Sequence, residues 1–312
     1  MKAIGNVGLG STSGLQVIEL PKPIAASGEA CIRVHAAAIN PTDTYIAAGR
    51  IGQRSQAIGP PFVPGMDVAG TIDHIGPTTL TALSPGEAVI AIVFPSGPSG
   101  GYSEYVTVPI ESVCRAPKGV SMIAASTIPM NGLTALLTLD LLQLDPGASI
   151  AVTGAAGTYG GYVVELSKRA GQFVIADAAP SDVDFVESLG TDVLIPRDDQ
   201  FASHVRSHIA AGVDALADGA VIGNTAVRAI RDGGGYAAVR RFESPLERGI
   251  VLHQVWVDRY LRETSKLAEL AGLAECGDLT LRVADVYRPE QAEAAHLRLA
   301  AGGTRGRLVI EF

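Results

Sequence analysis

Two patterns of apolar and polar residues divide the chain near residue 120. On the N-terminal side, short apolar runs alternate with turns that contain Gly and Pro, and this pattern predicts strands at 30–37, 67–75, 88–94 and 102–108. Short strands that follow one another without intervening helices are typical of an all-β, barrel-like domain.

Beyond residue 120, compact apolar runs alternate with longer stretches that have helical spacing. The predicted helices are 123–142, 159–170, 181–189 and 201–211, and the predicted strands are 149–153, 173–177, 193–195, 215–217, 236–239 and 250–257. Strands that alternate with helices in this way predict a parallel sheet with right-handed crossovers. Helices at 260–275 and 289–301 and a strand at 307–312 complete the chain.

Residues 121–139 form an uncharged stretch that is long enough to cross a membrane. The stretch contains Ser, Thr, Asn and Pro, however, and Asp140 follows it directly. We therefore expect a buried helix with a polar, functional bend at this place, and no membrane partner.

The composition excludes several classes of protein. With 47% hydrophobic and 18% charged residues, the 312-residue chain can bury a large core, which rules out intrinsic disorder. The net charge is −8 and no run of Lys and Arg occurs, so we expect no nucleic-acid partner. Cys31, Cys114 and Cys276 are widely separated, which excludes a disulfide framework and a cysteine-rich zinc site. Since the N-terminus also lacks the apolar core of a signal peptide, we expect a cytoplasmic protein.

The 36 glycines gather in a few loops, and residues 152–161 hold the most informative group. Their sequence, VTGAAGTYGG, follows a predicted strand and opens a predicted helix, which is the context of a dinucleotide site. Because glycines lack side chains, the backbone N–H groups at the start of the helix can approach a pyrophosphate. The predicted cofactor contacts in this loop are Ala156, Gly157, Thr158, Tyr159 and Gly160. Tight packing of a strand on a helix would also favour glycine here.

Asp177 ends the next predicted strand, 17 residues beyond Gly160. An acid at that position accepts hydrogen bonds from a ribose diol and repels a 2′-phosphate, which favours NADH. Arg197 follows the third strand, and as a cation near the same pocket it favours NADPH. The alternative interpretation makes both residues charges on loop surfaces.

The chain resembles the medium-chain dehydrogenases/reductases, and within them the zinc-free quinone oxidoreductase (ζ-crystallin-like) branch. The resemblance covers nearly the whole chain and rests on motifs at 35–45, 64–70, 100–106, 132–135, 154–160, 212–218 and 306–309. It implies an α/β fold with a GroES-like β-barrel catalytic domain at 1–120 and 262–312. It also implies a Rossmann domain with a doubly wound parallel sheet at 121–261, NADPH or NADH as cofactor, and a homodimer.

Zinc-dependent members of that family carry a Cys where this chain has Asn40 and a His where it has Met66. An amide and a thioether do not replace a thiolate and an imidazole as ligands of a catalytic zinc. We therefore expect no bound metal and no zinc-assisted oxidation of alcohols.

The chemistry that the resemblance still implies is hydride transfer to a quinone or an α,β-unsaturated carbonyl compound. Tyr45 matches a family tyrosine that faces the substrate, and Asn40 matches a residue near the nicotinamide, so both are candidate catalytic residues. Thr134 matches a threonine that lines the cofactor cleft. The alternatives are an aromatic at the barrel edge for Tyr45, a turn residue for Asn40 and an ordinary helix residue for Thr134.

Two other functions stay open. An enoyl reductase of secondary metabolism would use the same hydride chemistry. A nucleotide-binding sensor without catalysis would fit two departures from the family pattern: Thr158-Tyr159 in place of the common Gly-Val, and a long loop at 50–61 where substrate should enter. Tyr159 would either narrow the cofactor site or pack inward.

The strand predicted at 250–257 resembles the edge strand through which family dimers join their sheets, although an edge strand without a partner would look the same. Two further motifs predict no chemistry of their own. Residues 97–101 spell GxSxG, but a strand follows where a nucleophile elbow needs a helix. His204 and His208 have the spacing of a zinc helix but lack its Glu, and a solvated helix face explains them.

Overall fold

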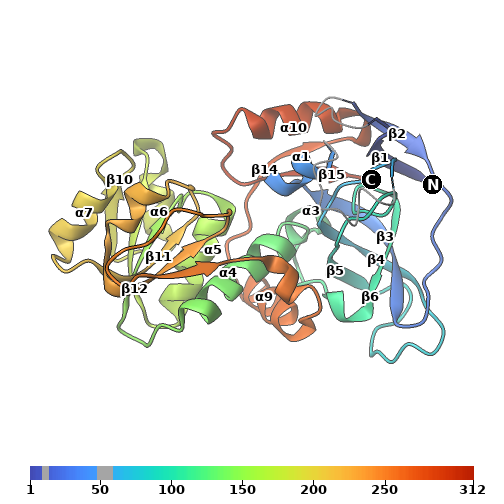
Figure 1. The fold of residues 1–312 in the computed structure, drawn as a ribbon. Helices are drawn as coiled ribbons and strands as arrows, with labels where there is room; N and C mark the ends of the chain where they lie inside the picture. The colour runs from blue at the N-terminus through green and yellow to red at the C-terminus, as the bar shows by residue number, and fades with distance from the viewer. Residues whose placement is uncertain (9–13, 48–58) are drawn as a thin grey trace. The chain divides into compact units, whose positions relative to one another are not determined.

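The computed structural model describes residues 1–8, 14–47 and 59–312, and contacts divide the described chain into two compact units. The first unit consists of Met1–Met130, Leu261–Gly277 and Leu281–Phe312, and the second consists of Asn131–Tyr260 and Asp278–Thr280. The C-terminal segment therefore returns to the first unit and lies beside the strands of the N-terminal part (Figure 1).

The first unit is built on a seven-stranded sheet in the order β14-β15-β3-β4-β5-β7, with β6 also paired to β3. Its strands are β3 (Glu29–Ala38), β4 (Asp67–Ile75), β5 (Ala88–Ile92), β6 (Tyr105–Pro109), β7 (Val113–Arg115), β14 (Val283–Tyr287) and β15 (Arg307–Glu311), and a separate pair joins β1 (Lys2–Asn6) to β2 (Leu15–Glu19). Among the described strands of the first unit, only the β14–β15 pair is parallel. The all-β prediction is confirmed, although the pattern did not show β1, β2, β7 and β14.

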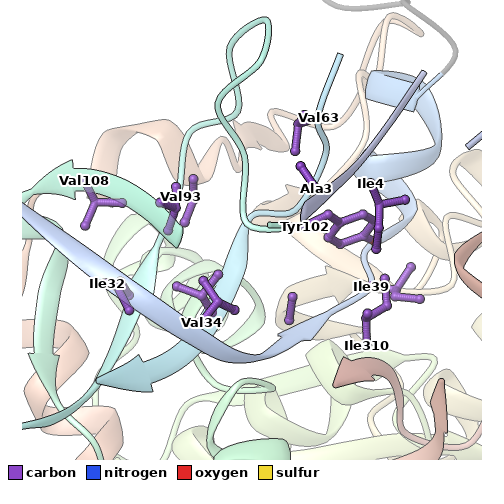
Figure 2. Close-up of a cluster of buried hydrophobic side chains, with 14 of the residues drawn as sticks. Ala3, Ile4, Ile32, Val34, Ile39, Val63, Val93, Tyr102, Val108 and Ile310 are labelled. Atoms are coloured by element: carbon purple, nitrogen blue, oxygen red, sulfur yellow. The ribbon is translucent and has the colours of Figure 1, made fainter. Parts of the chain in front are cut away.

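Short helices accompany these strands. They are α1 (Pro41–Ala47), η1 (Ile110–Ser112), α3 (Met122–Ala125), α9 (Thr264–Cys276), η4 (Pro289–Gln291) and α10 (Ala292–Ala300). The apolar faces of the strands and of α10 meet in one core, in which Tyr102 is a fully buried aromatic residue. Figure 2 shows Tyr102 beside Ile4, whose backbone N–H donates to the Tyr102 carbonyl over 2.7 Å.

The second unit holds a six-stranded, fully parallel sheet in the order β10-β9-β8-β11-β12-β13. Its strands are β8 (Ser149–Thr153), β9 (Phe173–Ala178), β10 (Val193–Pro196), β11 (Val213–Asp218), β12 (Ile230–Ala238) and β13 (Val251–Gln254). The connecting helices are α5 (Thr158–Arg169), η2 (Pro180–Asp182), α6 (Val183–Ser188), α7 (Phe201–His208), α8 (Asn224–Val227) and η3 (Val257–Tyr260). Numbered along the chain, the strand order is 3-2-1-4-5-6, so the prediction of a doubly wound sheet is confirmed.

The helix predicted at 123–142 is broken into α3 and α4 (Pro129–Leu142). Pro129 cannot donate a backbone hydrogen bond, and the hydroxyls of Ser126 and Thr127 bond back to the carbonyls of Ile123 and Ala124, which ends α3. The stretch Met122–Leu142 is long and apolar enough to span a membrane, but 72% of its most apolar window is buried inside the protein. Such burial is what a core helix shows.

Candidate functional site

The glycine-rich turn joins the end of β8 to the start of α5. Gly154 has a φ of +69°, a conformation that favours glycine, and its neighbours turn tightly beneath the helix. A Cβ on Gly160 would lie 2.3 Å from the Gly154 carbonyl oxygen, so only glycine fits there. Within the described chain, no side chain caps the first turn of α5. The first turn of this helix has uncapped N–H groups, and its glycines let a ligand come close to the backbone. These two features fit the pyrophosphate of a dinucleotide.

Asp177 holds this turn in place. Its Oδ1 atom accepts hydrogen bonds from the backbone N–H groups of Gly154 at 2.7 Å and Ala155 at 3.2 Å, and only 3% of the residue is exposed. Burial raises the pKa of the Asp177 carboxyl, and the Ala155 N–H, Arg197 and the Gly154 N–H oppose that shift. The interpretation of Asp177 as a loop-surface charge is therefore wrong, because the side chain is buried under the turn. Its contact with a ribose stays a prediction.

Arg197 lies beside Asp177 at the end of β10. Its Nε atom is 3.9 Å from Asp177 Oδ2, and 44% of the Arg197 side chain is exposed while only 4% of the Asp177 side chain is. The guanidinium therefore presents positive charge to solvent at the edge of the sheet and partly offsets the charge of Asp177. That arrangement suits a phosphate better than an acid alone would.

Tyr159 packs inward, which was one of its two predicted alternatives. Its phenol oxygen lies 2.8 Å from Thr138 Oγ1, and Thr138 in turn donates to the carbonyl of Thr134. A Cβ on Gly219 would lie 2.9 Å from the Tyr159 ring, so the ring fills the space between α4 and the end of β11. Tyr159 therefore links the phosphate-loop helix to the helix that carries Thr134. Thr134 itself is 7% exposed, and its contact with a cofactor stays a prediction.

The candidate residues of the first unit belong to one segment: Asn40 directly precedes α1, and Tyr45 lies within it. Tyr45 is 43% exposed, which leaves its side chain accessible to a substrate. Asn40 precedes the helix and is fully buried, with its Nδ2 atom donating to Asp67 Oδ2 at 2.8 Å. The catalytic roles of Tyr45 and Asn40 stay predictions. Most of the loop predicted to receive substrate, at 50–61, lies outside the described residues.

A buried polar cluster surrounds Asn40. We call it the α1 anchor, and its members are Asn40, Asp43, Asp67, Tyr102, His296 and Arg307, each no more than 5% exposed. Asp67 accepts hydrogen bonds from the Asn40 amide, from the Met130 N–H at 2.6 Å and from Arg307 at 3.2 Å. Asp43 and Asp67 lie in motifs on which the family resemblance rests, yet the sequence did not single them out. An acid next to a run such as Val-Ala-Gly is a signal that could have identified Asp67.

Burial changes the acidity of the groups in the α1 anchor. Desolvation raises the pKa of Asp43 to about 7, and it raises the pKa of Asp67 against the effect of Arg307. Burial lowers the pKa of His296 to about 4, so this imidazole is neutral at pH 7. Desolvation, followed by the charge of Asp43, also raises the pKa of Tyr102 well above its usual value. Strongly shifted groups that lie together are more frequent at functional sites than elsewhere.

The donor set at the position of the family's catalytic zinc does not fit that metal. The amide N–H of Asn40 donates a hydrogen bond to Asp67, and Met66 is a thioether that is 6% exposed. Among the described residues, one group has metal-ligand spacing: Cys31, Asp73 and His74. His74 accepts the Ala25 N–H at Nε2 and bonds to Asp73 through Nδ1, so both ring nitrogens are already used. We therefore assign no metal site.

Neither of the remaining two motifs has the local geometry that its chemistry needs. Ser99, in the GxSxG segment, lies in a tight turn closed by two backbone hydrogen bonds with Ser96, and the next regular element is β6. His204 bonds to Asp198 at 3.1 Å on an exposed helix face. All three cysteines are free.

Two family models match the chain in sequence. The alcohol dehydrogenase GroES-like domain matches residues 26–118, and the zinc-binding dehydrogenase domain matches residues 189–310. Together these matches cover more than two thirds of the chain. The first match confirms the GroES-like assignment of the N-terminal strands.

Curated relatives and solved structures agree with these matches. A chloroplast envelope quinone oxidoreductase homolog of Arabidopsis thaliana is 32% identical over 195 residues, which are 60% of this chain and 57% of that protein. A 2-methylene-furan-3-one reductase of Solanum lycopersicum is 28% identical over 242 residues, 75% of this chain and 61% of that protein. The aligned regions thus span less than two thirds of these relatives.

Among solved structures, a mycobacterial protein in complex with NADPH superimposes with a TM-score of 0.85 at 25% identity, and the match covers 100% of both chains. The two family models, the quinone oxidoreductase relatives and the full-length structural match lead to one assignment. The chain belongs to the medium-chain dehydrogenase/reductase family.

Proposed function

We propose that the protein is a reductase that uses NADPH or NADH to transfer a hydride to a quinone or an α,β-unsaturated carbonyl compound, without a catalytic zinc. The observation that carries the proposal is the uncapped, glycine-bounded start of α5, where Gly160 leaves no room for a side chain. The names of the relatives, a quinone oxidoreductase and an enone reductase, support the class of substrate. The amide and thioether at Asn40 and Met66 support a reaction without zinc.

The bound nicotinamide would supply the hydride. The start of α5 and the turn that Asp177 ties down would hold the pyrophosphate. Negative charge grows on the carbonyl oxygen of the acceptor as the hydride arrives, and a hydrogen-bond donor there lowers the barrier. The accessible phenol of Tyr45 is our candidate for that donor.

Oxidation of NADPH and NADH by the purified protein, followed at 340 nm with a quinone, an enone and an enoyl thioester, tests this function. Turnover with the quinone or the enone, unchanged by a zinc chelator, is the expected result. Preference for the thioester would favour an enoyl reductase, the second candidate. Cofactor binding without turnover of any acceptor would favour a nucleotide-binding sensor and overturn the reductase.

For the choice between the two cofactors, we propose that Arg197 favours NADPH. Replacing Arg197 with Gln is expected to raise the KM for NADPH by about tenfold, because a charge-assisted contact to the 2′-phosphate is lost. The KM for NADH should change little, since NADH carries no phosphate there. Arg169→Gln removes a surface cation that pairs with Asp278 in the same unit and serves as the control. An equal rise in both KM values would contradict the role.

We also propose that β13 joins two copies into a homodimer. Among the described strands, β13 is the last of its sheet and pairs with β12 alone. Val251 in β13 and Trp256 just after it are 52% and 43% exposed. The free edge of a terminal strand, with exposed apolar side chains beside it, is a template for pairing with another chain. Light scattering after size exclusion should give a dimer for the wild type and a monomer for the Val251→Glu/Trp256→Glu variant. A monomeric wild type would contradict the proposal.

A further inference from the structure

Helix α1 carries the accessible Tyr45 but cannot hold its own position. It has seven residues, and helices of that length are not stable in water without tertiary contacts. The location of the Tyr45 side chain therefore depends on the contacts that fix α1 to the rest of the first unit. Ile46 and Ala47 of the helix are buried, and the Asn6 amide donates to the Ala47 carbonyl. The buried side chain of Asp43 adds hydrogen bonds to other segments.

Asp43 is fully buried and accepts three hydrogen bonds from three separate segments. Its Oδ2 atom accepts the Asn40 N–H at 2.7 Å, which closes the first turn of α1. Its Oδ1 atom accepts the Gly65 N–H at 3.0 Å, which ties α1 to the turn before β4. The Tyr102 hydroxyl donates to Oδ2 over 3.3 Å.

The third contact extends the chain of hydrogen bonds into the C-terminal segment. The Tyr102 oxygen lies 3.1 Å from Nε2 of His296 on α10, and the two rings meet edge to face. Tyr102 lies deep in the core of the first unit (Figure 2). A side chain on α1 is thus bonded through a core aromatic to a residue more than 250 positions away in the sequence.

Burial of the Asp43 carboxylate costs free energy, which argues that this side chain does more than fill space in the core. No Lys or Arg in the described chain forms an ion pair with Asp43, and the charges that face it are those of Asp67, which repels it, and Arg307, which attracts it. A buried carboxylate costs free energy unless donors surround it, and an apolar residue would avoid that cost. The carboxylate accepts hydrogen bonds from two backbone N–H groups, and the directions of these bonds fix the position of the helix.

We propose that Asp43 is a positioning residue that holds α1, and with it Tyr45, in the geometry for hydride acceptance by the substrate. This inference rests on the proposed reductase function. Asp43 itself touches neither substrate nor cofactor, because it has no accessible surface. It acts through the hydrogen bonds to Asn40 and Gly65.

The test replaces Asp43 with Asn, which keeps the size but turns one acceptor into a donor that faces a backbone N–H. The kcat for the best acceptor should fall by about 10- to 100-fold, since small displacements of a catalytic group have effects of that size. The KM for the cofactor should stay within about twofold, because the cofactor turn lies in the other unit. Thr44→Ala is the matched control: it removes a hydrogen bond to Pro41 in the same turn of α1 from a side chain outside the anchor.

Hydrogen exchange of the peptide that covers residues 39–47 gives a readout that does not depend on turnover. Exchange should accelerate in Asp43→Asn and stay unchanged in Thr44→Ala, at a temperature where both variants are folded. A kcat unchanged by Asp43→Asn, or exchange equal to the wild type, would overturn the positioning role. If the wild type itself turned over no acceptor, the proposed function would fail, and the exchange measurement would decide alone whether Asp43 orders α1.

The dependence of stability on pH adds a signature of the buried carboxyl. Burial raises the pKa of Asp43 to about 7 from its usual value near 4, so the folded protein binds a proton between these values that the unfolded chain releases. The wild type should therefore gain stability relative to Asp43→Asn as the pH falls from about 7 to 4. His296 shifts in the opposite direction, but it is common to both proteins and cancels in the comparison. A Tm difference that is constant over this range would contradict a buried, titrating Asp43.

Discussion

Alanine at position 160 is expected to weaken binding of NADPH or NADH by about tenfold or more. The added Cβ would lie 2.3 Å from the carbonyl oxygen of Gly154, 2.7 Å from its carbonyl carbon and 2.9 Å from the Cα of Ala155. All three atoms belong to the backbone, so the turn itself has to move, and it would carry away the N–H groups that we propose to hold the pyrophosphate. Titration of the cofactor by calorimetry measures the loss.

A neighbouring glycine provides the matched control. A Cβ on Gly161 would meet the Ala155 oxygen at 3.4 Å and the Leu189 Cδ1 atom at 3.5 Å, which are ordinary contact distances. Gly161→Ala should therefore bind the cofactor as the wild type does, and the better helix propensity of Ala should stabilise α5 slightly. Equal affinities of Gly160→Ala and the wild type would show that the cofactor does not bind at this turn.

Removal of the Arg307 guanidinium is expected to lower the free energy of unfolding by about 3–5 kcal/mol. Arg307 pairs with Asp67 at 3.2 Å, and the two side chains are 6% and 0% exposed. Arg307→Met would leave the Asp67 charge buried, and among the described residues the Asn40 amide and the Met130 N–H would be its remaining donors. Urea denaturation measures the change. The loss should shrink as the pH falls, because burial raises the pKa of Asp67 and the unpaired carboxyl can then take up a proton.

Two further variants distinguish the effect of the Asp67–Arg307 ion pair from the effect of its burial. Asp67→Asn/Arg307→Met removes both charges, and its loss of stability should be smaller than that of Arg307→Met alone, since no uncompensated charge stays buried. Arg169→Met breaks the exposed pair with Asp278, which has a similar distance of 3.0 Å, and should cost less than about 1 kcal/mol. Equal losses for Arg307→Met and Arg169→Met would contradict the role of burial.

The second unit was the more predictable part of the fold, because the sequence pattern that marks each of its helices and strands lies within one continuous segment. Alternation of apolar runs and helical stretches marks β8, α5 and β9 to within about one residue, and the glycine pattern locates the phosphate turn. The missed strands have a different origin. β7 has three residues, and Asp285 interrupts the short apolar sequence of β14, so neither strand forms a continuous apolar run.

The candidate site was predictable only where one segment supplies all of its parts. The turn at 154–160 is such a segment, whereas the α1 anchor joins residues that lie up to 267 positions apart in the sequence, from Asn40 to Arg307. Hydrophobic periodicity does not report on pairs of that kind, because each member is a single polar residue inside an apolar stretch. The inward direction of Tyr159 was likewise open until the position of Thr138 was known.

The place of Asp177 beneath the turn has a consequence for re-engineering coenzyme preference. Exchange of the acid at the end of the second strand is a natural first choice when a dinucleotide enzyme is to accept the phosphorylated coenzyme. Here that exchange would also release the backbone of Gly154 and Ala155, and both coenzymes would then bind less well. A library aimed at preference should keep Asp177 and vary Arg197, whose exposed guanidinium can be replaced without loosening the turn.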